Sequence, residues 1–163
     1  MNCLKGTITG ISRSGSVAIV EVLIQNAALT ETAVPSETES LAPLTLTAMR
    51  LDASHSDNTW KKDQAVRLLF SEMEVALAKN LTGEISMRNR LQGVITAIEP
   101  GDVLTRVCFC LLQQGGQTVS SVITTRSARA MQLKVGDQIE GLVKSNEMNL
   151  HALNEYIDQK AQA

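Results

Sequence analysis

The sequence predicts an all-β protein built from two small β-barrels in tandem, with one short helix per repeat at most. The first observation is an internal repeat, because residues 2–11 align without a gap on residues 89–98 in the pattern Asn-x-Leu-x-Gly-x-Ile-Thr-x-Ile. The second is a series of short apolar, alternating segments separated by turn residues. Aromatic residues make up only 2% of the chain and hydrophobic residues 44%, so the cores must consist of Val, Ile, Leu and Ala. A chain of 163 residues accommodates two such units.

The first unit is expected to span residues 1–79. A Ser- and Gly-containing cluster between its first two strands is typical of a hairpin turn. A long Thr-, Ser-, Glu- and Pro-rich loop is expected at residues 26–43, and residues 52–63 are expected to be irregular or a short helix. The strands of this unit are predicted at residues 3–11, 17–25, 44–49, 66–70 and 75–78.

A linker at residues 80–85 is expected to lead into the second unit, residues 86–151. Thr124 or Thr125 is a plausible N-cap for a helix over residues 125–133, and residues 152–163 are expected to form a flexible tail. Short strands with regular turns and one helix indicate a barrel of the oligosaccharide- and oligonucleotide-binding (OB-like) type. The strands of this unit are predicted at residues 89–98, 103–113, 117–124, 138–144 and 147–151.

The composition favours a soluble cytoplasmic protein. The formal net charge is −2, whereas nucleic-acid binders usually carry a basic excess. Three cysteines are too few for a disulfide framework, which indicates a reducing compartment. The first residues lack the apolar core of a signal peptide, and no stretch approaches 18 apolar residues, so no membrane segment is expected.

Three polar clusters stand at element ends of the second unit and point to an oxyanion site. They contain hydrogen-bond donors and fixed positive charge without a carboxylate or histidine. The expected helix start near residue 125 would add free backbone N–H groups. An alternative is that these residues are ordinary surface, cap and strand-end positions. The clusters are Ser86 with Arg88, Thr124 with Ser127, and Lys144 with Ser145.

The order and spacing of these segments resemble the Mop domain, a molybdate-binding domain of the TOBE type. The resemblance covers about residues 85–151 and rests on Ser-x-Arg-Asn-x-Leu-x-Gly from Ser86, Val-Ile-Thr-x-x-Ser from Val122, Leu-Lys-Val-Gly-Asp from Leu133, and Val-Lys-Ser from Val143. It implies a small barrel that binds molybdate, or tungstate, at subunit interfaces of a homo-oligomer, a trimer or a dimer. The implied ligand residues are Ser86, Arg88, Thr124, Ser127, Lys144 and, through its backbone, Ser145.

The first unit resembles the same domain but departs from it at each ligand segment. No Ser-x-Arg precedes Asn2, Met49-Arg50-Leu51-Asp52 stands where Thr-x-x-Ser is expected, and Phe70 is assigned to the lysine position. The chain is therefore expected to be a tandem Mop protein whose first repeat is degenerate. Its expected role is intracellular molybdenum storage, buffering or sensing.

Other function classes receive less support from the sequence. No acid–base pair or nucleophile motif indicates an enzyme. Cys108 and Cys110 alternate on one strand without further ligands, so no metal site is expected, and Asp52, His55 and Asp57 lie in a polar loop. An oligonucleotide-binding module remains an alternative, disfavoured by the acidic charge and scarce aromatic residues. A structural oligomerisation domain without ligand is the other alternative.

Overall fold

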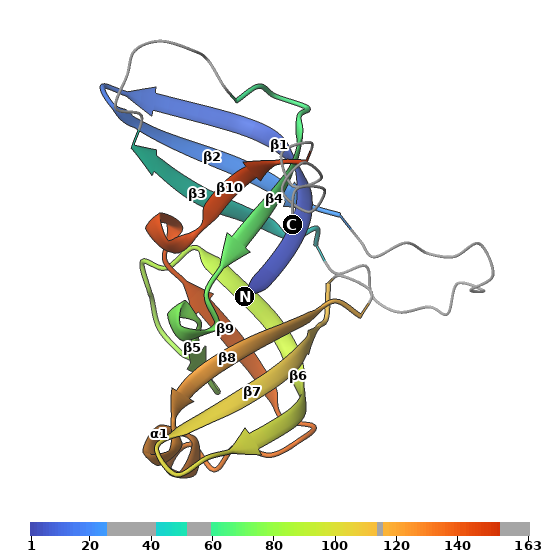
Figure 1. The fold of residues 1–163 in the computed structure, drawn as a ribbon, viewed down its shortest axis with the longest axis vertical. Coiled ribbons are helices and arrows are strands. Elements are labelled where there is room, and N and C mark those ends of the chain that lie inside the picture. Colours follow the sequence, from blue (N-terminus) through green and yellow to red (C-terminus); the bar gives the residue numbers. More distant parts are fainter. Residues whose placement is uncertain (26–41, 52–59, 114–115, 154–163) are drawn as a thin grey trace, which may run out of the picture.

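The computed structural model describes residues 1–25, 42–51, 60–113 and 116–153. Within these ranges the chain is almost entirely β-structure (Figure 1). The first half contains β1 (Asn2–Ser14), β2 (Val17–Ile24), β3 (Thr45–Leu51), β4 (Ala65–Phe70), the 3-10 turn η1 (Glu72–Glu74) and β5 (Ala76–Ala78). The second half contains β6 (Asn89–Pro100), β7 (Leu104–Leu111), β8 (Thr118–Thr124), α1 (Thr125–Ala130), β9 (Gln138–Val143), the 3-10 turn η2 (Ser145–Glu147) and β10 (Asn149–Ala152).

The predicted strands are confirmed to within a few residues at their ends. The helix is shorter than the predicted 125–133: it ends after Ala130 with Met131 as its C-cap, because Gln132 takes a left-handed conformation with φ 49°. The expected loop at 26–43, the segment 52–63 and the tail at 152–163 fall largely outside the described residues.

Two curled five-stranded antiparallel sheets follow one another along the long axis of the molecule (Figure 1). The first has the strand order β10-β4-β1-β2-β3 and the second β5-β9-β6-β7-β8. In the first sheet Gly6 pairs with Val66, and in the second Gly93 pairs with Ile139. The predicted all-β fold of two OB-like units in tandem is therefore confirmed.

The sheets do not follow the expected boundary between residues 79 and 86. β5 belongs to the first half of the sequence but pairs with β9, with Leu77 opposite Gly141. β10 belongs to the second half but pairs with β4, with Leu150 opposite Leu68. Each half therefore donates its last strand to the sheet of the other half.

The two sheets repeat each other in detail. β1 and β6 each carry a register shift at an equivalent place, between Ile8 and Gly10 and between Ile95 and Ala97. The repeated glycine is required in both, because a Cβ on Gly6 would lie 2.5 Å from the Leu23 carbonyl oxygen. A Cβ on Gly93 would lie 2.6 Å from the Cys110 carbonyl oxygen. The sequence repeat thus preserves a close approach of neighbouring strands.

A single cluster of buried apolar side chains runs through both sheets. Phe70 and Phe109 are its largest fully buried side chains, and Trp60, a larger member, is 7% exposed. The remaining members are chiefly Leu, Ile and Val, as the composition predicted. Among the described residues, no helix is long and apolar enough to cross a membrane.

Candidate functional site

The six predicted site residues lie at ends of strands in the second half of the chain. Ser86 and Arg88 precede β6, Thr124 and Ser127 lie where β8 passes into α1, and Lys144 and Ser145 follow β9. Five of the six are exposed and Ser145 is half-buried. Their side chains contribute little to the core, so their positions are free to serve a ligand.

A surface groove of about 530 Å³ brings together Thr124, Ser127 and Lys144. These residues come from two elements that are some twenty positions apart in the chain. Met87, between Ser86 and Arg88, also lines the groove, whereas Ser86, Arg88 and Ser145 do not. The groove therefore unites three of the six predicted residues, and Met87 brings the segment that holds two others, Ser86 and Arg88, to its edge.

Thr124 and Ser127 form a hydroxyl pair with a defined proton arrangement. Thr124 caps α1, its Oγ1 accepting from the Ser127 backbone N–H at 3.1 Å. The Thr124 hydroxyl donates to Ser127 Oγ at 2.8 Å. Since each hydroxyl has a single proton, that of Ser127 remains available for an external acceptor.

The charges around the groove are mixed. Lys144 and Arg88 have no ion pair or side-chain hydrogen bond to any other described residue. Glu74 and Glu147 also line the groove, and Glu147 accepts a hydrogen bond from the Asn146 side chain. The groove therefore combines the hydroxyl pair and the unpaired Lys144 with two carboxylates, and Arg88 lies outside it.

Behind the site, Asn89 connects the two sheets. Its Nδ2 donates to the Thr47 carbonyl oxygen at 2.9 Å, and its Oδ1 accepts from the Thr47 backbone N–H at 2.7 Å. The Thr47 hydroxyl also donates to Asn89 Oδ1 at 3.1 Å and lies 3.1 Å from Ser145 Oγ. Sequence reasoning did not find Thr47, because it lies in the half that lacks the ligand motifs.

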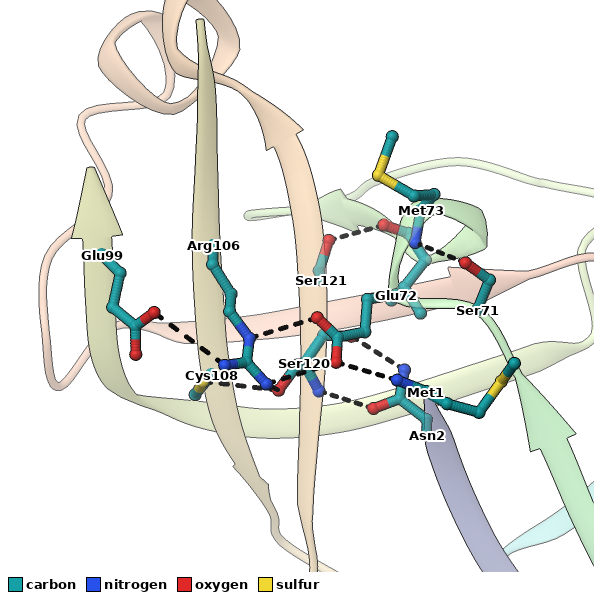
Figure 2. Close-up of polar contacts among 11 residues, drawn as sticks. Met1, Asn2, Ser71, Glu72, Met73, Glu99, Arg106, Cys108, Ser120 and Ser121 are labelled. Atoms are coloured by element: carbon teal, nitrogen blue, oxygen red, sulfur yellow. Dashed lines mark hydrogen bonds and ion pairs between the residues drawn. The ribbon is translucent and has the colours of Figure 1, made fainter. Parts of the chain in front are cut away.

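The equivalent junction in the other half is built differently (Figure 2). Asn2 exchanges two hydrogen bonds of 2.9 Å with the Ser120 backbone, as Asn89 does with Thr47. Phe70 pairs with Asn2 as Val143 pairs with Asn89, so Ser71, not Phe70, occupies the position equivalent to Lys144. The sequence alignment was wrong by one residue there, because only strand pairing fixes the register.

Glu72 consequently stands where the second half has Ser145. Its carboxylate lies 3.0 Å from the Met1 amino group, and Arg106 approaches it with Nε at 3.1 Å and Nη2 at 3.2 Å (Figure 2). The hydrogen bond from the Met1 ammonium, with Arg106 acting in the same direction, lowers the pKa of Glu72 below its ordinary value. The Glu72 carboxylate thus pairs with both cations of this junction, which are therefore not free to bind an external anion.

Comparison with known proteins bears directly on the second half. Residues 85–150 match the TOBE domain family. The second unit is a TOBE domain. This stretch contains all six predicted site residues and begins at the last residue of the expected linker.

Two relatives contain a region similar to this chain. The molybdenum import ATP-binding protein ModC of Brucella abortus (strain 2308) is 33% identical over 100 residues, 61% of this chain and 27% of that protein. The molybdenum transport protein ModE of Herbaspirillum seropedicae is 28% identical over 149 residues, 84% of this chain and 53% of that protein. The chain thus spans from about a quarter to about half the length of these relatives.

A solved structure shares the whole tandem fold. The cytoplasmic molybdate-binding protein ModG, in a form with molybdate bound, superposes with a TM-score of 0.77 at 23% identity. The match covers 93% of this chain and 95% of that chain. The arrangement of the TOBE domain beside a second, similar unit is therefore a known fold.

Proposed function

We propose that this chain is a non-enzymatic protein that binds molybdate, or tungstate, through its TOBE domain. The proposed ligand residues are Ser86, Arg88, Thr124, Ser127, Lys144 and the backbone of Ser145. The observation that carries this proposal is the groove in which Thr124, Ser127 and Lys144 meet. The names of the relatives, a molybdate-binding protein and two molybdenum transport proteins, support the choice of ligand.

The chemistry of these groups suits a tetrahedral dianion. Lys144 and Arg88 supply positive charge that no described residue neutralises. Hydroxyl donors such as that of Ser127 orient toward acceptor oxygens, and hydrogen bonds to a charged group are about twice as strong as neutral ones. The groove also contains the carboxylates of Glu74 and Glu147, which repel a dianion, so we place the dianion against Lys144 and the Ser127 hydroxyl.

We further propose that the site is completed between copies of the chain. Met73 and Leu104, both groove residues, are 59% and 43% exposed and form an apolar rim. Ser86, Arg88 and Ser145 lie outside the groove, where they could reach a ligand held by a neighbouring copy. A homo-oligomer, a trimer or a dimer, is thus expected in light scattering, and a monomer with and without molybdate would contradict it.

The cellular role we propose is storage, buffering or sensing of molybdate in the cytoplasm. ModG, which shares the fold, is a cytoplasmic molybdate-binding protein. ModC and ModE, in which the similar region occupies only part of a longer chain, act in molybdenum import and transport. Metal analysis of the purified protein, with calorimetric titration of molybdate, tungstate and sulfate, tests this role and the ligand preference.

Lys144→Ala tests the site directly. The change removes a charge-assisted hydrogen bond worth roughly 1.5–3 kcal/mol, so the Kd for molybdate should rise about ten- to hundredfold. Because Lys144 is exposed, the fold should be unaffected. Lys134→Ala, an exposed lysine outside the site, is the matched control at one salt concentration. Equal affinities of the two variants would refute the site assignment.

A further inference from the structure

Thr47 of the first sheet contacts two segments of the TOBE domain at once. Its hydroxyl lies 3.1 Å from Asn89 Oδ1 and 3.1 Å from Ser145 Oγ. Asn89 directly follows Arg88, and Ser145 directly follows Lys144. A single side chain from the half without ligand motifs therefore lies between the two segments that carry the unpaired cations.

The protons of this chain of hydrogen bonds can be assigned. Asn89 Oδ1 can only accept, so the Thr47 hydroxyl donates its proton there. The contact between Thr47 Oγ1 and Ser145 Oγ then requires the Ser145 hydroxyl to be the donor. The Ser145 side chain consequently has no proton left for an oxyanion, and only its backbone can donate to one.

The sheet alone does not fix these segments. The pairing of β6 with β9 ends with Asn89 opposite Val143, and Arg88 and Lys144 lie just beyond this last pair. At this same end of β6 and β9, the Thr47 hydroxyl of the first sheet contacts both Asn89 and Ser145. Its loss would leave Ser145 and the start of η2 without this link to β3.

We propose that Thr47 is a positioning residue for the oxyanion site of the TOBE domain. Its hydroxyl orients Asn89 and Ser145 and thereby holds Arg88 and Lys144 in a fixed relation. The first half, which lacks the ligand motifs, thus takes part in binding. This inference rests on the proposed function and assigns a role to a residue outside residues 85–150.

The other junction provides an internal contrast. Ser120 occupies the place of Thr47 there, but its hydroxyl lies 3.3 Å from an Arg106 nitrogen and 3.4 Å from Cys108 Sγ. The residue in the position of Ser145 is Glu72, whose carboxylate forms an ion pair with Arg106. The hydroxyl relay between the two segments therefore exists only at the junction beside the proposed site.

The test compares Thr47→Val, which removes the hydroxyl at constant shape, with Thr47→Ser, which keeps it. Both retain the backbone hydrogen bonds to Asn89. In calorimetric titration of the full chain with molybdate, Thr47→Val should bind about tenfold more weakly, as is typical when a supporting hydrogen bond is lost. Thr47→Ser should restore the natural affinity. Ser120→Ala, the hydroxyl deletion at the other junction, is the matched control and should not change binding.

A double-mutant cycle separates positioning from direct contact. If Ser145 acts through Thr47, the combined Thr47→Val and Ser145→Ala variant should bind no more weakly than Thr47→Val alone. Natural affinity in Thr47→Val, or losses from Thr47→Val and Ser145→Ala that add up in the double variant, would overturn the inference while leaving the proposed function intact. No binding by the natural protein would instead refute the proposed function. Thr47→Ala repeats the measurement if Thr47→Val does not fold.

Discussion

Removing the Asn89 side chain should destabilise the whole protein, because Asn89 joins the two sheets. Asn89 is fully buried, and in Asn89→Ala both the N–H and the carbonyl of Thr47 would lose their partner. An unsatisfied buried polar group costs about 1–3 kcal/mol, and Thr47 is half-buried, so we expect a loss of roughly 2–4 kcal/mol in the free energy of unfolding. That is a large part of the roughly 5–15 kcal/mol available to a folded domain.

Urea denaturation followed by circular dichroism and by the fluorescence of Trp60 would measure this loss. Trp60 is buried in the core and belongs to the first half of the sequence, so its signal reports on that half. Asn149→Ala is the control, because Asn149 is exposed and makes no side-chain hydrogen bond to other described residues. A stability of Asn89→Ala within about 0.5 kcal/mol of the natural protein would refute the role of this side chain.

Two further changes test the packing and the charges. Gly93→Ala forces a Cβ to 2.6 Å from the Cys110 carbonyl oxygen and should cost about 1–3 kcal/mol in urea denaturation. Gly10→Ala should cost less, because its nearest atom belongs to the flexible Glu21 side chain, and equal losses would contradict this reasoning. The hydrogen bond from Lys79 lowers the pKa of Asp137 below its ordinary value of 3.8. The interaction between Lys79 and Asp137 therefore stabilises the fold fully above pH 3.8, and this stabilisation is lost as the pH falls through the lower pKa of Asp137 in the folded state. Thermal unfolding of Lys79→Met should therefore be less sensitive to acid than that of the natural protein, and identical pH profiles would disprove the link.

Local patterns predicted most of the strands and the repeat. Alternation of apolar residues located β1 and β6, and the repeated Asn-x-Leu-x-Gly pattern correctly matched Asn2 with Asn89. These signals are local in sequence, and they depend on strand periodicity and on turn residues. The fold class could therefore be derived without long-range information.

The partners of the short strands could not be predicted in this way. β5 and β10 contain three and four residues, too few for periodicity to show which sheet they join. The same lack of pairing information placed Phe70 at the lysine position, which Ser71 occupies. Thr47 and Glu72 acquire their roles only through contacts between the halves, so no motif within one repeat could reveal them.

The crossing of β5 and β10 has a consequence for how such a protein could arise. A single repeat folded alone would leave one sheet edge uncovered and one short strand without a neighbour. Two separate copies could cover each other's open sheet edges by exchanging these short strands, as in a domain-swapped dimer. Joining the two copies in one chain keeps this exchange of strands and allows the sequence of each half to change independently. A carboxylate could then replace the Ser145 counterpart in one half while the other half kept its exposed cations.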